Sequence, residues 1–143
     1  MRRFVTLLIA LALLTLVVPS VAAAASCPKI VGFATLQVDT QANSGVGTAL
    51  VKLGGTFEIV SFDSTATPTS TGLDATQNWY FAAGTVTFLE HASPKPVGNK
   101  FLSIKSPVEV TAGGSGSLSY NGLYDLSTNI ATFSLNGRLC IGS

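Results

Sequence analysis

Charged side chains are scarce in this chain of 143 residues: lysine, arginine, aspartate and glutamate together make up 10% of it. A soluble intracellular domain averages about 25%. Histidine occurs once, tryptophan once and cysteine twice. The chain therefore lacks the ligands of a multi-histidine or four-cysteine zinc centre, and it also lacks the basic clusters with which proteins bind nucleic acid. We expect no metal, no other cofactor and no nucleic-acid partner.

Helical periodicity is missing after residue 25. Apolar and polar residues alternate instead in short runs, and glycine, proline, asparagine and serine separate these runs. This pattern is typical of β-strands about 8–13 residues apart. We predict one all-β domain over residues 26–143, an antiparallel β-sandwich of about nine or ten strands, with a small closed β-barrel as the alternative.

The first 25 residues have the pattern of a secretion signal. Arg2 and Arg3 form a basic start, an apolar run follows from Phe4 to Val18, and small residues lead up to Ala25. We predict a cleaved signal peptide over residues 1–25, with an uncleaved membrane anchor as the alternative. Cleavage would leave no membrane span and would place the domain outside the cell or in a periplasm.

The two cysteines lie near opposite ends of the expected domain. Cys27 directly follows the signal, and Cys140 stands three residues before the end of the chain. In an oxidising compartment two such cysteines are expected to pair, so we predict a Cys27–Cys140 disulfide. The alternative is that Ala24-Ala25-Ser26-Cys27 acts as a lipoprotein cleavage site and Cys27 carries a lipid anchor.

The end of the chain contains the strongest turn signal. Asn136-Gly137 stands between two short β-like runs in residues 129–141, and Asn-Gly is favoured in two-residue hairpin turns. We predict a hairpin there. Its register would place Cys140 next to Phe133, on the face that Ala131 and Leu135 share with Phe133.

The remaining strands are predicted from alternation. A polar stretch from Asp63 to Thr76 is expected to be an exposed loop, functional or disordered, because it is rich in threonine and serine. Ser106-Pro107 is expected to separate two short strands, since proline is confined to strand edges and starts. The predicted strands are Ile30–Val38, Gly47–Leu53, Thr56–Phe62, Gln77–Ala83, Gly84–His91, Lys100–Lys105, Val108–Ala112 and Ser117–Tyr124.

No catalytic constellation is visible. His91 follows Glu90, but neighbours in a strand point to opposite faces, so the two are not expected to share a site. The glycine-rich run at residues 113–117 departs from the Gly-x-Ser-x-Gly pattern of serine hydrolases. We assign no catalytic residue and favour a protein that is not an enzyme.

Aromatic residues are the candidate ligand contacts. Trp79, Phe81, Tyr120 and Tyr124 offer large rigid surfaces that can stack on a ligand or glycan. For Trp79 and Phe81, packing in the core is the favoured interpretation and a binding platform is the alternative. Several strands are also apolar on both faces, which indicates either central strands or a face covered by another subunit.

These observations support three hypotheses about function. The first is a secreted or cell-surface β-domain, not an enzyme, that acts in assembly, adhesion or surface structure by pairing with itself or with a surface partner. The second is an extracellular β-barrel that binds a small apolar ligand or a glycan. The third is a secreted enzyme of unknown class.

Overall fold

The computed structural model describes residues 26–142, so the predicted signal peptide at 1–25 lies outside the described residues. Within this range there are nine strands and no helix, which confirms the all-β prediction. Accordingly, residues 26–142 contain no helix that could cross a membrane. The strands are β1 (Lys29–Asp39), β2 (Ser44–Leu53), β3 (Thr56–Pro68), β4 (Leu73–Phe81), β5 (Gly84–Ala92), β6 (Lys95–Val97), β7 (Phe101–Ala112), β8 (Gly114–Asp125) and β9 (Ile130–Ile141).

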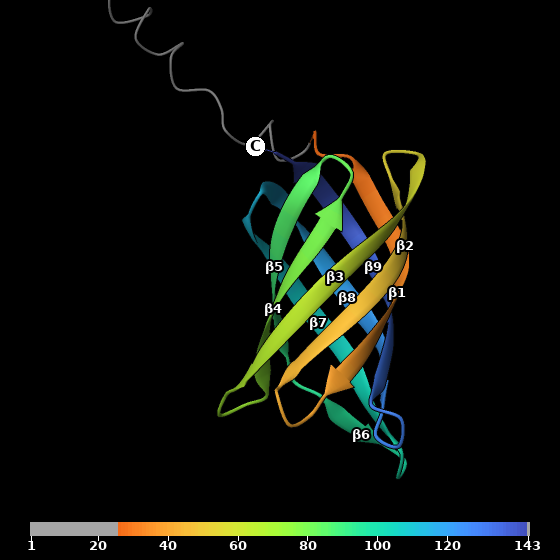
Figure 1. Ribbon diagram of the computed structural model, residues 1–143, viewed down its shortest axis with the longest axis vertical. Helices are drawn as coiled ribbons and strands as arrows, with labels where there is room; N and C mark the ends of the chain where they lie inside the picture. The colour runs from red at the N-terminus through yellow and green to blue at the C-terminus, as the bar shows by residue number, and fades with distance from the viewer. Residues whose placement is uncertain (1–25, 143) are drawn as a thin grey trace, which may run out of the picture.

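Eight of these strands close into an antiparallel barrel (Figure 1). Consecutive strands pair with each other except β5 and β6, and β1 also pairs with β9. The ring closes where β5 pairs with one stretch of β7, while the short β6 pairs with another stretch of β7. The preferred sandwich is therefore wrong, and the alternative of a small closed barrel is confirmed. Strands with alternating apolar and polar residues suit a sandwich and a barrel equally. The β5–β7 pairing decides between them, because it joins the two ends of the sheet and leaves a closed ring.

Asn136 and Gly137 do not form a turn, so the predicted final hairpin is wrong. They lie within β9, where Gly137 pairs with Ile30 of β1 and with Leu118 of β8. A β-carbon at Gly137 would lie 2.2 Å from the carbonyl oxygen of Ser117. Glycine is needed here because the backbone of β8 comes so close, and this role leaves the same sequence signal as a turn.

The polar stretch from Asp63 to Thr76 is mostly strand, which corrects the prediction of a long loop. Residues 63–68 extend β3, residues 73–76 begin β4, and only the four residues between them form the turn. The threonines point outward at alternate positions, and β-branched residues suit such positions. The polar composition therefore did not indicate a loop. These parts of β3 and β4 face solvent on one side, and most of their inward-facing residues are small.

Strand β7 continues through Ser106-Pro107, so the predicted break is also wrong. β7 pairs with β5 from Val108 onward and with β6 only up to Ser103. Pro107 lies between these two paired stretches, where its missing N–H interrupts no pairing on that side. The proline therefore follows the rule for strand edges while remaining inside a continuous strand.

The predicted disulfide is confirmed. Cys27, just before β1, is bonded to Cys140 near the end of β9, and their Cα atoms are 4.9 Å apart. The predicted face of Cys140 is wrong, because in an unbroken β9 it is Leu139 that points inward with Phe133. A lipid anchor would require the sulfur of Cys27, but in the structure this sulfur is bonded to Cys140. Arg138 also donates a hydrogen bond to the Cys27 carbonyl oxygen at 2.9 Å.

Candidate functional site

The barrel has two different ends. At one end, which we call the disulfide end, the turns between strands are one or two residues long. At the other, which we call the open end, the connections are four residues or longer, and one of them carries β6 (bottom of Figure 1). Longer loops around one mouth of a barrel are typical of the end at which ligands enter.

A cavity of about 280 Å³ lies inside the barrel at the open end. This volume is close to the lower limit of ligand pockets, about 300–1,000 Å³, so the cavity suits a small molecule. Most of its wall is apolar. The described residues that line it are Leu36, Val38, Thr40, Asn43, Ser44, Gly45, Ser64, Ala66, Leu73, Ala75, Gln77, Glu90, Ala92, Pro94, Leu102, Ile104, Tyr124 and Ala131.

Small inward-facing residues create this cavity. An eight-stranded barrel is just wide enough for side chains to fill its interior or for one small ligand to replace them. At the open end β3 contributes Ser64 and Ala66, β4 contributes Ala75, and β5 contributes Ala92. Because none of these side chains reaches the barrel axis, the space that they leave remains open.

A hydrogen-bonded cluster around Gln77 separates the cavity from the aromatic core. The Gln77 carbonyl oxygen accepts hydrogen bonds from the Trp79 indole and the Tyr120 hydroxyl, both at 2.9 Å. The Gln77 amide nitrogen donates to Glu90 Oε1 at 3.4 Å. Two donors on the carbonyl fix the orientation of the amide, which turns its NH₂ group toward Glu90.

Glu90 is a buried carboxyl group. Its side chain faces the barrel interior from β5, and the residue is only 8% exposed. Burial raises the pKa of Glu90, because a charged carboxylate is disfavoured away from water. The nearby Ser106 hydroxyl opposes this effect and lowers the pKa of Glu90, although among the described residues Ser106 Oγ has no partner with standard hydrogen-bond geometry.

The four predicted aromatics occupy two different places. Trp79, Phe81 and Tyr120 are buried in the core, and Trp79 stacks on the ring of Phe62 at 4.3 Å between centroids. Tyr124 is the one that lines the cavity, where its hydroxyl donates to Asn129 Oδ1 at 2.8 Å. The structure thus places Tyr124 at the cavity and the other three beneath it.

Gln77 and Glu90 were missed from the sequence. Each lies on the inward face of its strand, and Glu90 stands between two apolar inward residues, Phe88 and Ala92. A charged residue at an inward position of an otherwise apolar face was the available signal.

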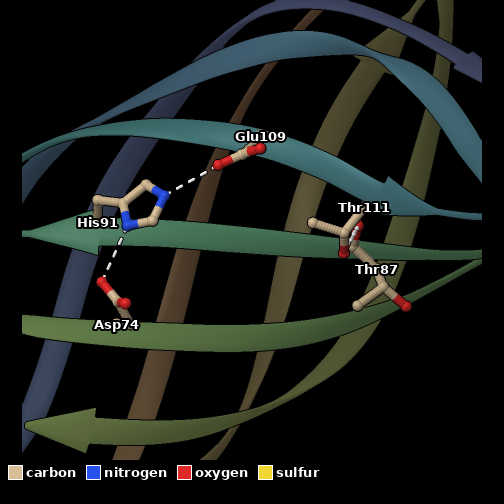
Figure 2. Close-up of polar contacts among 5 residues, drawn as sticks. All are labelled: Asp74, Thr87, His91, Glu109 and Thr111. Carbon is tan, nitrogen blue, oxygen red and sulfur yellow. Dashed lines mark hydrogen bonds and ion pairs between the residues drawn. The ribbon is translucent and has the colours of Figure 1, made fainter.

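His91 lies on the outer surface of the barrel near the open end (Figure 2). Its Nδ1 is 2.9 Å from Asp74 of β4, and its Nε2 is 2.9 Å from Glu109 of β7. These two contacts raise the pKa of His91, since both carboxylates favour the protonated ring. The two contacts link three adjacent strands, β4, β5 and β7, across the closure of the barrel.

An exposed apolar patch covers the outside of β1, β2 and β3. We call it the outer apolar face, and it consists of Phe33, Leu50, Phe57 and Ile59. Leu50 pairs directly with Phe33 on one side and with Ile59 on the other. All four side chains are more than half exposed, which is uncommon for adjacent large apolar residues on a monomer.

The comparisons with known proteins return no relative. No protein-family model, no curated protein and no solved structure matches this chain. Within residues 26–142, no group of three histidine, cysteine, aspartate or glutamate side chains is arranged to hold a metal ion. The cavity and the outer surface of the barrel are therefore the features that bear on function.

Proposed function

We propose that this protein is an extracellular or periplasmic binding protein that holds a small, mainly apolar molecule in the open end of its barrel. The observation that carries this proposal is the cavity of about 280 Å³, which has apolar walls and a polar floor at Gln77 and Glu90. An apolar pocket with a few convergent polar groups is the usual form of a small-molecule site. The disulfide supports this location, because disulfides persist in oxidising compartments.

A cavity-blocking variant tests the proposal. Ala66 faces the cavity from β3, and its neighbour Thr67 faces outward on the same strand. We expect 1-hexanol to bind the mature wild-type protein, which is residues 26–143 without the predicted signal peptide. Binding should change the amide chemical shifts of residues around the open end. Ala66→Phe should abolish these changes, and the matched control Thr67→Phe should preserve them. Equal responses in the two variants would contradict binding in the cavity.

The outer apolar face supports a second candidate function, assembly with a second copy of this chain. Its centre carries no charge, while Lys52 and Asp63 lie at opposite ends of the same outward-facing area on β2 and β3. A two-fold arrangement with antiparallel strands would bring Lys52 of each copy toward Asp63 of the other and bury the apolar residues between them. This is the assembly hypothesis in a form that can be tested.

Sedimentation equilibrium of residues 26–143, the protein without its predicted signal peptide, tests this second candidate. If the outer apolar face mediates assembly, the wild-type protein should form dimers as its concentration rises. Ile59→Glu should then yield a monomer, because it places a charge in the middle of the apolar face. The matched control Ser119→Glu adds a charge to the outside of β8 and should leave the dimer intact. A wild-type protein that stays monomeric at high concentration would rule out this candidate.

A further inference from the structure

Glu90 stands out among the residues that line the cavity. In the described part of the chain, the lining contains no lysine, arginine or histidine, and Tyr124 is its one other titratable side chain. A carboxyl group thus lies at the floor of an apolar cavity without a positive charge beside it. Such a group is costly to leave unpaired, because proteins normally pair a buried charge or keep it neutral.

Within residues 26–142, the neighbours of Glu90 offer it no opposite charge. Gln77 faces it from β4, Ser106 from β7 and Tyr120 from β8. Tyr120 donates its hydroxyl hydrogen to Gln77 and is therefore not available to the carboxyl group. Burial raises the pKa of Tyr120 well above its usual value, and burial also raises the pKa of Tyr124. A tyrosine hydroxyl is neutral or negative and never positive, so neither tyrosine can supply an opposite charge to the carboxylate.

The hydrogen bonds at the floor of the cavity use its donors and leave acceptor capacity on Glu90. Both donors near the floor, the Trp79 indole and the Tyr120 hydroxyl, are used by the Gln77 carbonyl oxygen. The Gln77 amide nitrogen is already directed at Glu90 Oε1. The acceptor capacity left on the Glu90 carboxylate is therefore the main polar feature that the floor offers to a ligand, and it suits a ligand that donates hydrogen bonds.

We propose that the cavity selects apolar amines, with the hydrocarbon part against the aliphatic walls and the ammonium group against the Glu90 carboxylate. This inference builds on the ligand-binding function proposed above and specifies its ligand class. An ammonium supplies both the positive charge and the hydrogen-bond donors that the floor lacks, and charge-assisted hydrogen bonds are stronger than neutral ones. Carboxylate ligands are disfavoured, since they would bring a second negative group to Glu90.

Three probes of equal chain length test the ligand class. Hexylamine, 1-hexanol and hexanoate differ only in the polar end, and their affinities for the mature protein can be measured by calorimetry or by amide chemical shifts. At pH 7.5 we expect hexylamine to bind about tenfold more tightly than 1-hexanol, and hexanoate to bind most weakly. Hexylamine should also lose affinity as the pH falls through the raised pKa of Glu90, whereas 1-hexanol should not.

Glu90→Gln identifies the residue responsible. It keeps the size of the side chain and removes the carboxylate, so the variant is expected to fold, which circular dichroism and its melting temperature would verify. Hexylamine should lose about tenfold in affinity for this variant, and 1-hexanol should change by less than about twofold. The matched control Glu109→Gln makes the same chemical change on the outside of the barrel and should alter neither affinity.

The outcomes separate the two proposals. If 1-hexanol binds in the cavity with the same affinity as hexylamine, the ligand class is wrong and the binding function stands. The same conclusion follows if Glu90→Gln binds hexylamine with the affinity of the wild type. Tighter binding of hexanoate would show that the cavity takes acids with Glu90 protonated, and it would overturn the amine proposal. If none of the three probes binds the wild-type protein, the proposed function itself fails.

Discussion

The two ends of the barrel are built from the same strands, but side chains fill them differently. Along β4, the inward positions are Phe81 and Trp79 toward the disulfide end and Ala75 toward the open end. Along β5 they run from Phe88 to Glu90 and Ala92. The disulfide half is packed solid by stacked aromatics, and the open half contains the cavity.

This difference shows how one ring of strands can serve both stability and binding. Backbone hydrogen bonds between strands hold the whole circumference, so the interior need not be filled along its full length. Large side chains in one half supply the hydrophobic stabilisation. The other half is then free to carry small residues and a buried carboxyl group, which would weaken a core if they were distributed throughout it.

Breaking the disulfide should have the largest effect. Cys27→Ser opens a covalent link between residues 113 positions apart, which in the chain-entropy model lowers the free energy of unfolding by about 4–5 kcal/mol. Thermal and urea unfolding of the mature protein would measure this loss. Wild-type protein reduced with dithiothreitol is the control and should show a similar loss. Two free thiols in unreduced wild-type protein would contradict the prediction.

Truncation of one large side chain in each half tests the comparison directly. Phe88 is fully buried in the aromatic half, so Phe88→Ala should lower the free energy of unfolding by about 3–5 kcal/mol. Leu102 lines the cavity and is half-buried, so Leu102→Ala should cost about 1 kcal/mol. Urea unfolding compares the two variants, and equal losses would show that the halves are equally well packed.

Replacing a small inward-facing residue by a larger one should change the free energy of unfolding in opposite directions in the two halves. Ala75→Leu extends into the cavity and should raise the free energy of unfolding by about 0.5–2 kcal/mol. Ala49 is buried and pairs with Ala34 in the packed region, so Ala49→Leu should lower it by about 1–3 kcal/mol through overpacking. Urea unfolding again provides the measurement, and a destabilised Ala75→Leu would show that the cavity cannot accept added side-chain volume.

The smallest effect is expected at His91, which supports the open end from outside. Its contacts with Asp74 and Glu109 raise its pKa in the folded protein, so its stabilising effect is fully present below about pH 6.5 and is lost as the pH rises through the raised value. The wild-type melting temperature should therefore fall relative to that of His91→Gln between pH 5.5 and 8.5. Parallel curves for the two proteins would show that the contacts contribute nothing to stability.

The candidate site was only partly predictable from the sequence. Tyr124 was named as a candidate ligand contact, and it does line the cavity, whereas Tyr120 was named with it and belongs to the core. Trp79 and Phe81 were also candidates, but core packing was favoured for both, and both are buried in the core. A strand pattern indicates which residues share a face and not how far along the barrel each one lies. Depth along the axis separates a cavity wall from a packed core, and it depends on the register of all eight strands.

By itself, the sequence determined the class of fold, most of the strands and the disulfide. Alternation of apolar and polar residues is a local property, and two cysteines in one chain have a single way to pair within it. The tertiary structure alone decided that the sheet closes, that Asn136-Gly137 runs straight through β9, and that Glu90 lies under a cavity. Each of these depends on contacts between residues far apart in the chain, and no local pattern records them.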